Sequence, residues 1–265
     1  MSRSFGNDQL NFDTLRASLG EDGRDFSLHA FSELDSTNSE AKRLAVAGAH
    51  TPALIVAERQ TAGRGRMGRS FYSPANTGVY FSILFDAKTA MEEALSVTSA
   101  VAVAVMRAIR RLCDKQTAIK WVNDLYLEGK KVCGILTEAI SGLGEPSKIV
   151  VGIGINLRTN EFPSELQSKA GSLGDGQLSR AELIAGVVHE LLPYLRDPTD
   201  DSWLDDYRTH SCVIGRTVTW TKGDKHCSGV AVGIDGRGAL EIRLPDGSSD
   251  FLRTGEISVF AEEWK

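Results

Sequence analysis

The chain has 265 residues, enough to bury a core in one large domain or in a main domain with a small appendage. Hydrophobic residues make up 42% and charged residues 25% of it, which is typical of a globular protein rather than a disordered one. The formal net charge of -5 argues against a broad basic face for nucleic acid or anionic lipid. We therefore expect any basic cluster to be local.

The cysteines Cys113, Cys133, Cys212 and Cys227 show neither C-x-x-C spacing nor paired histidines nearby. A zinc site or a disulfide framework therefore has little support, and reduced thiols are expected. The N-terminus lacks the layout of a secretory signal, and the longest apolar stretch, 97–106, is too short to span a bilayer. The sequence thus predicts a cytoplasmic protein without a membrane segment.

The first 140 residues alternate between helical and strand patterns. An amphipathic opening at 12–19 precedes a predicted strand at 28–34, and the polar residues at 35–38 favour the start of a helix that runs to about Ala47. A tight turn at Gly129-Lys130 is expected between two strands. The further elements predicted here are strands at 53–57 and 79–85, a long helix at 91–113, and strands at 119–122, 125–128 and 131–140.

The next 70 residues add one strand and two helices. The near-continuous apolar run at 149–157 predicts a strand at the centre of its sheet, covered on at least one face. Ser179 favours a helix through Leu195, and a second helical stretch surrounds 203–207. Long helices and strands in irregular order indicate an α+β fold, a mixed sheet backed by helices.

Beyond His210 the pattern changes to short alternating runs. Gly223-Asp224, Asp235-Gly236 and Asp246-Gly247 separate these runs and are typical of hairpin turns. This spacing predicts a small all-β barrel. We place the boundary near residue 210, with domains at 1–210 and 211–265.

The run from Gly63 to Ser70 places three arginines among three glycines, directly after a predicted buried strand. Glycines permit positive φ and close approach of backbone N–H groups to an anion, and each guanidinium can bind phosphate or carboxylate oxygens in bidentate fashion. The run predicts an anion-binding loop, and its three like charges favour ordering when an anion arrives. A flexible basic loop on a solvated surface is the alternative.

The same run nearly matches a phosphate-binding P-loop, with Arg69 in place of the usual lysine. A P-loop must open a helix, whereas Pro74, Asn76 and Gly78 make the following stretch turn-like. We therefore exclude a P-loop, and the run alone names no substrate.

Lys120 lies within an apolar strand pattern, followed by Asn123 and Asp124. An unpaired buried ammonium would be costly to desolvate, so an anionic substrate would suit it as a partner. Alternation allows the opposite as well, because Lys120 can point to solvent while its neighbours point inward. Asn123-Asp124 can equally be only a turn.

The segment 151–157 resembles a dinucleotide fingerprint, but Leu157 stands in place of the third glycine and no helix follows. Gly152 and Gly154 would instead leave room for a flat ligand against the strand, and Asn156 offers a donor and an acceptor to it. Close packing of strands or helices is the alternative explanation for the glycines.

Five ordered blocks resemble the signature of biotin protein ligases, and the similarity runs from about residue 28 to the C-terminus, including 255–258. The blocks are 35–38, 60–69, 120–125, 131–138 and 152–156. The resemblance implies a class II synthetase-like catalytic domain, the biotin-lipoate ligase fold, followed by an SH3-like barrel. It implies an enzyme that joins biotin to ATP with Mg²⁺, releases pyrophosphate, and passes the biotinoyl group to one lysine of a carboxyl carrier domain.

The resemblance also implies roles for individual residues. Arg66 and Lys120 would be catalytic, with Lys120 between the carboxylate and the α-phosphate. The biotin site would comprise Ser36, Thr37, Asn38, Gln60, Arg64, Gly65, Arg66, Lys120, Gly134 and Gly152. Arg69, Asn123 and Asn156 would lie on the nucleotide side, and the metal ligands stay unknown. Because a positioned set of cations serves this chemistry, no nucleophilic triad is required.

The chain departs from the family pattern at a few positions. Phe71 replaces a usual Trp, so the apolar wall over biotin is altered but still aromatic, Val122 replaces a usual Pro, and Phe260 stands where some members have a basic residue. Some members also repress transcription through an N-terminal winged helix. Only 35 residues precede Ser36 here, so we expect no operator binding.

Two rival functions stay open at this stage. A lipoate or octanoate ligase would share the fold but not the Gly-Arg-Gly-Arg block at 63–66. A non-catalytic biotin-binding module would have no need for both Lys120 and Arg66. The sequence leaves the oligomeric state open, a homodimer included.

Overall fold

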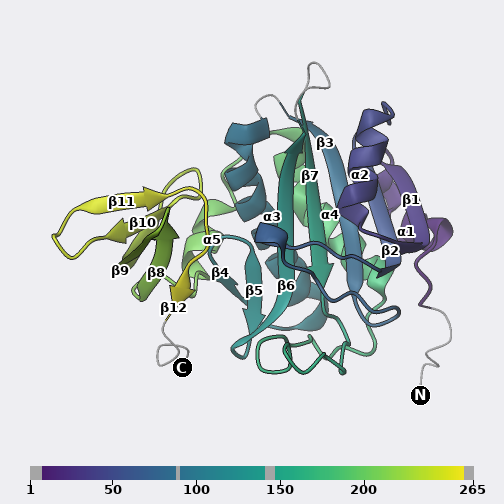
Figure 1. The fold of residues 1–265 in the computed structure, drawn as a ribbon. Helices are drawn as coiled ribbons and strands as arrows, with labels where there is room; N and C mark the ends of the chain where they lie inside the picture. Colours follow the sequence, from purple (N-terminus) through teal and green to yellow (C-terminus); the bar gives the residue numbers. More distant parts are fainter. Residues whose placement is uncertain (1–7, 88–89, 141–146, 260–265) are drawn as a thin grey trace.

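The computed structural model describes residues 8–87, 90–140 and 147–259, and the strands of this part form two sheets (Figure 1). The larger sheet has the strand order β1-β2-β3-β7-β6-β5-β4. The first pair is parallel and the others are antiparallel, so the sheet is mixed, as predicted. Its strands are β1 (Ser27–Leu34), β2 (Ala53–Gln60), β3 (Val79–Ala87), β4 (Ala118–Lys120), β5 (Asp124–Leu127), β6 (Lys130–Ile140) and β7 (Ser147–Ile155).

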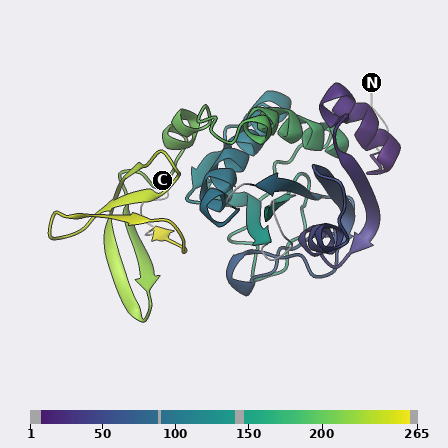
Figure 2. The same cartoon turned by 90° about the horizontal axis from the view of Figure 1, so that it is seen from above.

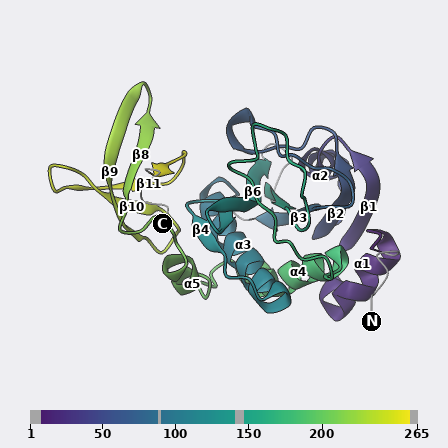
Figure 3. The same cartoon turned by 90° about the horizontal axis from the view of Figure 1, so that it is seen from below.

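Helices cover both faces of this sheet, as Figures 2 and 3 show: α1, α3 and α4 form a layer on one face, and α2 lies on the other. The α4 helix begins with a capping box in which Ser179 and Glu182 exchange side-chain and backbone hydrogen bonds. This cap confirms the predicted start. The helices are α1 (Phe12–Leu19), α2 (Thr37–Val46), α3 (Ala90–Cys113), α4 (Arg180–Arg196) and the short α5 (Leu204–Thr209).

Strand alternation divides the core into two parts. Leu54 and Val56 of β2 belong to the large cluster under α1, α3 and α4, whereas Ile55 belongs to a small cluster with Ala41 and Ala45 of α2. The central strand β7 is covered on both faces for the same reason. The prediction that 149–157 is central is therefore confirmed.

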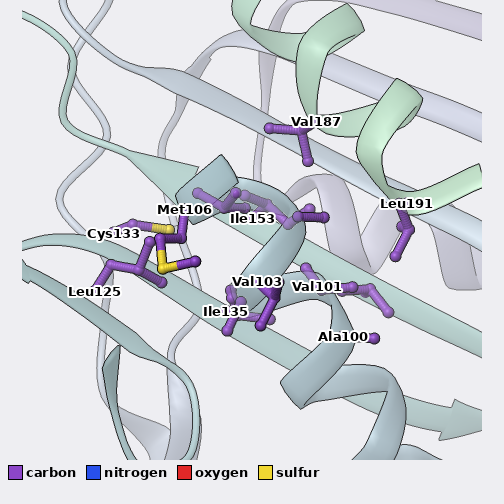
Figure 4. Close-up of a cluster of buried hydrophobic side chains, with 14 of the residues drawn as sticks. Ala100, Val101, Val103, Met106, Leu125, Cys133, Ile135, Ile153, Val187 and Leu191 are labelled. Atoms are coloured by element: carbon purple, nitrogen blue, oxygen red, sulfur yellow. The ribbon is translucent and has the colours of Figure 1, made fainter. Parts of the chain in front are cut away.

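The large cluster lies between α3, α4 and the strands β5, β6 and β7 (Figure 4). The α3 helix contributes small and β-branched residues, which let it pack closely on the sheet. Gly186 of α4 faces α3, and a Cβ there would lie 2.7 Å from the Leu112 side chain. The two helices therefore approach each other closely at this glycine.

Several strand boundaries differ from the predictions: β2 extends to Gln60, β7 runs from Ser147 to Ile155, and two boundaries of the hairpin series change. The first strand of the hairpin series ends at Lys120, because 121–123 form a turn that includes a cis Trp121–Val122 peptide bond. The following hairpin turns at Glu128-Gly129, one residue earlier than expected, and both residues have positive φ, as two-residue hairpins prefer.

The smaller sheet is antiparallel with the order β11-β10-β9-β8-β12. Its predicted hairpin turns at 223–224, 235–236 and 246–247 all lie between strands. No pair between β11 and β12 closes the sheet within the described residues. Its strands are β8 (Thr217–Lys222), β9 (Lys225–Ile234), β10 (Leu240–Arg243), β11 (Ser249–Leu252) and β12 (Ser258–Val259).

In the part of the chain that the structure describes, no helix combines the length and the apolar character needed to cross a bilayer.

Met106 tests the α3 interface, because its side chain is buried against the sheet (Figure 4). Met106→Ala is expected to lower the free energy of unfolding by about 2–5 kcal/mol, since it removes buried methylenes and leaves a cavity. Urea unfolding followed by circular dichroism measures this change. Val46→Ala on the exposed side of α2 is the control, with a change within about 0.5 kcal/mol. Equal losses in the two variants would contradict this description of the core.

Candidate active site

Three glycines form a bare patch on the α2 face of the large sheet. Gly134 of β6 pairs directly with Gly154 of β7, and Gly152 lies one row further along between Leu136 and Ser82. The patch is the floor of a cavity, which we call the glycine cavity. Its walls are Ser36, Thr37, Asn38, Gln60, Arg64, Gly65, Phe71, Asn123, Lys131, Ile135, Leu136 and Ile153.

The start of α2 forms one wall of the glycine cavity. Gln60, at the end of β2, accepts hydrogen bonds from the Thr37 backbone N–H at 2.9 Å and from the Thr37 hydroxyl at 3.2 Å. The buried Ser82 hydroxyl lies 2.7 Å from Asn38 Oδ1 and donates to it, and 2.8 Å from the Thr37 hydroxyl. The polar groups of this wall are therefore held in fixed orientations before any ligand binds.

The Phe71 ring lies directly on the floor. A Cβ added to Gly154 would lie 2.5 Å from a ring carbon of Phe71, and one added to Gly134 would lie 3.3 Å from the ring. Tyr80 supports the ring from the side in an edge-on contact with centroids 6.3 Å apart. The position that the sequence marks as an aromatic wall is therefore part of the cavity.

The Gly/Arg run forms a short antiparallel loop above this floor, with Arg64 bridged to Ser70 and a turn at Arg66–Gly68. Met67 and Gly68 take positive φ at its tip. Gly63 is needed for a different reason, because a Cβ there would lie 2.7 Å from the Ser73 hydroxyl. The stretch that follows is not helical, which confirms the exclusion of a P-loop.

Each arginine of the loop has its own acceptor. Arg64 forms an ion pair with Glu138 of β6 at 3.1 Å, and Arg69 forms one with Glu256 near the C-terminus at 2.6 Å. Arg66 donates to two neutral groups, Asn123 Oδ1 at 2.9 Å and the Gly255 carbonyl at 2.7 Å. The three like charges are thus separated within the protein itself.

The environments of Arg66 and Arg69 differ in their effect on pKa. Burial lowers the pKa of Arg66, although the nearby charges of Asp124 and Glu256 act in the opposite direction. The hydrogen bond that Arg69 donates to the Glu256 carboxylate raises the pKa of Arg69. Arg66 is therefore the poorly solvated cation of the loop, and an anion bound beside it would be attracted strongly.

A second cavity adjoins the first, and we call it the lysine cavity. Asn123 and Lys131 line both cavities, so the two meet at these side chains. The Lys120 ammonium lies 5.8 Å from the centroid of the Tyr126 ring beside it. The other residues that line the lysine cavity are Arg66, Met67, Arg69, Trp121, Asp124, Glu256 and Ile257.

Contacts with α5 and with the C-terminal sheet fix the turn that carries Asn123. The buried Trp121 indole donates to the Gly238 carbonyl at 2.9 Å, and Tyr207 donates to the Val122 carbonyl at 3.0 Å. Asn123 itself donates to the Ile135 carbonyl at 2.9 Å. The position of Asn123 therefore depends on both sheets, and Lys120 directly precedes this turn.

Arg66 also reaches a third space, a cleft between the α3 side of the large sheet and the smaller sheet. Arg237 and Arg253 line this cleft from the smaller sheet, and Thr98 and Thr137 line it from the larger one. Arg66 thus lines both this cleft and the lysine cavity, and its hydrogen bond to Asn123 connects it to the rim of the glycine cavity.

The structure brings most of the predicted site residues together. Ser36, Thr37, Asn38, Gln60, Arg64, Gly65, Gly134 and Gly152 line the glycine cavity, Arg66, Arg69 and Lys120 line the lysine cavity, and Asn123 lines both. Asn156 is not among the described residues that line these spaces. Its amide donates to the Gly171 carbonyl at 2.9 Å, and its Oδ1 atom is buried without a hydrogen bond to the described residues.

Lys131 is a site residue that the sequence analysis did not select. Its ammonium lies 2.7 Å from Asp124 Oδ1, and a Cβ on Gly134 would lie 3.0 Å from the same ammonium. Lys131 therefore stands on the cavity face of β6. The reason is a register shift in the pairing of β5 with β6. Leu125 pairs with Cys133, and the next residue, Tyr126, pairs with Lys131, so β6 has one extra residue between the two pairs.

No three His, Cys, Asp or Glu side chains gather into a metal site among the described residues. Asp124 and Glu256 are the carboxylates on the lysine cavity. Such a sparse set suits Mg²⁺ that binds together with a phosphate ligand, because Mg²⁺ keeps several waters and needs only one or two protein carboxylates.

Comparisons with known proteins agree with this site. The Biotin/lipoate A/B protein ligase family model matches residues 30–156, and the model of the Biotin protein ligase C terminal domain matches residues 213–259. The chain therefore belongs to the biotin/lipoate protein ligase family. Within that family its similarity is to biotin protein ligases, as the resemblance of the five sequence blocks predicts.

Two curated relatives and one solved structure illustrate the similarity. The bifunctional ligase/repressor BirA of Bacillus subtilis is 32% identical over 228 residues, which cover 81% of this chain and 68% of the relative. The biotin--[acetyl-CoA-carboxylase] ligase of Paracoccus denitrificans is 31% identical, with 80% and 92% covered. The biotin protein ligase of Aquifex aeolicus in complex with biotin and ATP superimposes with a TM-score of 0.75 at 29% identity, covering 88% and 98%.

The pKa of Glu138 gives a test of the contacts in this site. Burial acts to raise it, but hydrogen bonds from Lys42 and Asn38 and the charges of Lys42 and Arg64 outweigh burial, so the pKa lies below its ordinary value of 4.5. A lowered pKa means that the ionised form stabilises the fold above pH 4.5, and that this contribution is lost as the pH falls through the lowered pKa.

Glu138→Gln is therefore expected to unfold at a lower temperature than wild type at pH 7, with a difference that shrinks at pH 3. Thermal unfolding at both pH values measures this. Glu33→Gln is the matched control, because Glu33 of the edge strand β1 forms an exposed ion pair with Arg59. Its replacement should change the unfolding temperature little. A difference that is equal at both pH values would contradict the assigned charge of Glu138.

Proposed function

We propose that this chain activates biotin with ATP to biotinyl-5'-AMP and transfers the biotinyl group to a lysine of a biotin carboxyl carrier domain. The observation that carries the proposal is the meeting of two cavities at Asn123 and Lys131. One cavity has a flat floor and a wall of fixed amides and hydroxyls, and the other is lined by four basic side chains. A small carboxylic acid in the first would present its carboxylate to a nucleotide phosphate in the second.

The glycine cavity suits the fused rings of biotin. The bare backbone of Gly134, Gly152 and Gly154 leaves room for a flat group, and the α2 wall offers donors and acceptors to a ureido group. Phe71 occupies the floor above Gly134 and Gly154, so the ring has to move before a ligand can lie there. After that movement the ring would cover the ligand as an apolar wall.

The chemistry needs positive charge rather than a protein nucleophile. In the first step a biotin carboxylate oxygen attacks the α-phosphorus of ATP, and the bond to pyrophosphate breaks. In the second step the amine of the carrier lysine attacks the acyl carbon, AMP leaves, and the amine loses a proton. Charge builds on phosphoryl oxygens in the first step, where Arg66, Lys120 and Lys131 lie around the lysine cavity.

Mg²⁺ would supply further positive charge to the phosphates when it binds with ATP. Asp124 and Glu256 are the carboxylates that would hold it, directly or through water. Lys131 already pairs with Asp124, so binding of a cation there would release this lysine toward the carboxylate of the substrate.

The remaining predictions join this proposal. We place the domain boundary near residue 210, which agrees with the matched ranges 30–156 and 213–259. The acceptor is expected to be the carrier domain of a carboxylase, as the name of the Paracoccus relative implies for that protein. A cytoplasmic location, a possible homodimer and the absence of operator binding stay predictions.

A single assay separates the proposal from its rivals. The chain is incubated with labelled biotin, Mg-ATP and a biotin carboxyl carrier domain, and both biotinyl-5'-AMP and labelled carrier are measured. Parallel reactions contain lipoate and a lipoyl domain. Transfer of lipoate alone would support a lipoate ligase, and binding of biotin without adenylate would support a non-catalytic module.

Lys120 and Arg66 are expected to be required for adenylate formation. Lys120→Ala or Arg66→Ala should lower its rate constant by at least about 100-fold, because each removes a fixed cation from the phosphate side of the site. Release of labelled pyrophosphate measures the rate, and circular dichroism verifies the fold. Lys115→Ala, at an exposed position shortly before β4, is the control. Wild-type rates for Lys120→Ala would show that Lys120 is only a surface residue.

The glycine floor gives a second prediction. Gly154→Ala places a methyl group where the Phe71 ring and a flat ligand would lie, so the KM for biotin should rise roughly tenfold or more. Steady-state kinetics with varied biotin measures it. Gly233→Ala on β9 is the matched control, because its Cβ would meet only the flexible end of Glu241, at 3.3 Å. An unchanged KM for Gly154→Ala would exclude this floor as the biotin site.

A further inference from the structure

Glu138 of β6 connects three segments around the glycine cavity. Its Oε1 atom accepts a hydrogen bond from the Lys42 ammonium at 2.7 Å and one from the Arg64 guanidinium at 3.1 Å. Its Oε2 atom accepts one from the Asn38 amide at 2.9 Å. Strand β6, helix α2 and the Gly/Arg run at 63–70, which we call the arginine loop, are therefore joined through one carboxylate. The Glu138 side chain is only 18% exposed.

One branch of this network orients a cavity residue. Asn38 donates to Glu138 and to the Leu136 carbonyl, and its Oδ1 atom accepts from Ser82. All the hydrogen-bonding positions of this amide except one acceptor lone pair are thereby occupied. Asn38 also stands directly above Gly152, since a Cβ there would overlap its side chain. Glu138 thus helps to fix the edge of the floor.

The other branch holds the arginine loop. Arg66 and Arg69 are bonded to the C-terminal segment at Gly255 and Glu256, whereas the bond from Arg64 to Glu138 connects the loop to the large sheet. Arg64 lines the glycine cavity, so this ion pair lies at the rim of the cavity. Breaking it would leave the loop held by Arg69, which bonds Glu256, and by Arg66, which bonds both Gly255 and Asn123.

We propose that Glu138 is a positioning residue that holds the arginine loop closed through Arg64 and so slows the escape of the acyl-adenylate. This inference rests on the proposed function. A mixed anhydride is hydrolysed if it reaches water, so the site has to retain it until the carrier lysine arrives. A latch at the rim controls retention, and it acts on the dissociation rate more than on the chemical step.

Glu138 has a second partner that permits a discriminating control. Lys42 lies on α2 and does not belong to the loop, so Lys42→Met removes the charged anchor of α2, leaves the neutral one from Asn38, and keeps the link to Arg64. Arg64→Gln removes the loop link and keeps the α2 anchor. If Glu138 only supports the fold of α2, Lys42→Met should behave like Glu138→Gln. If Glu138 acts as the latch, Arg64→Gln should instead behave like Glu138→Gln.

The experiment measures the dissociation of labelled biotinyl-5'-AMP from the full chain. The enzyme is loaded with labelled biotin and Mg-ATP, chased with excess unlabelled biotin, and sampled by filter binding. Glu138→Gln and Arg64→Gln should each raise the dissociation rate constant by roughly three- to tenfold, a range that allows for the partly exposed guanidinium. The KM for biotin should rise with it, while the kcat for adenylate formation should change less.

The double variant supplies the strongest test. If both residues act through one ion pair, Glu138→Gln with Arg64→Gln should dissociate no faster than the faster single variant. The latch would be overturned if the two single effects on the dissociation rate constant multiplied in the double variant. A wild-type rate constant in Glu138→Gln, or an increase in Lys42→Met equal to that in Glu138→Gln, would overturn it as well. If Glu138→Gln does not fold, a wild-type dissociation rate in Arg64→Gln would still overturn the latch, because that side chain is 44% exposed and its replacement should leave the fold intact. Failure of the wild-type chain to form any adenylate would instead contradict the proposed function.

Discussion

The site depends on one constraint: two neighbouring strands carry glycines at adjacent positions on the same face, so that no side chain covers the backbone there. Gly134 and Gly154 are direct partners on β6 and β7, and Gly152 extends the bare surface by one row. Among the described residues, side chains reach this surface from the start of α2, from Phe71, and from Lys131 of β6. Because the floor at these three positions is backbone alone, the start of α2 and the arginine loop can lie close above it.

The C-terminal part of the chain supplies the second constraint, because it contacts residues that line the lysine cavity. Trp121 is bonded to Gly238, Arg66 to Gly255, and Arg69 to Glu256. The turn after Lys120 and the tip of the arginine loop are thus held from the same side. The smaller sheet contributes few residues to the site, but through these hydrogen bonds it can set the distance between Lys120 and the arginines of the loop.

The sequence was most informative where the signal is local. The cap at Ser179 and the long helix at 91–113 depend on neighbouring residues, and both predictions agree with the structure. Lys131 was missed because strict alternation places it and Gly134 on opposite faces, whereas the register shift near Leu125 brings them to the same one. The pair of Arg64 and Glu138 is separated by 74 residues, so it depends on the tertiary fold and not on a pattern.

The acceptors of the three arginines explain how one short loop can serve two purposes. Arg64 and Arg69 face carboxylates, and an incoming phosphate would have to displace a charged partner from either of them. Arg66 donates to an amide and a carbonyl, which are neutral and weaker acceptors, and it is also the arginine that burial desolvates. A new anion therefore gains more at Arg66 than at Arg64 or at Arg69. The first of these residues is suited to the chemistry, and the second is suited to holding the loop in place around it.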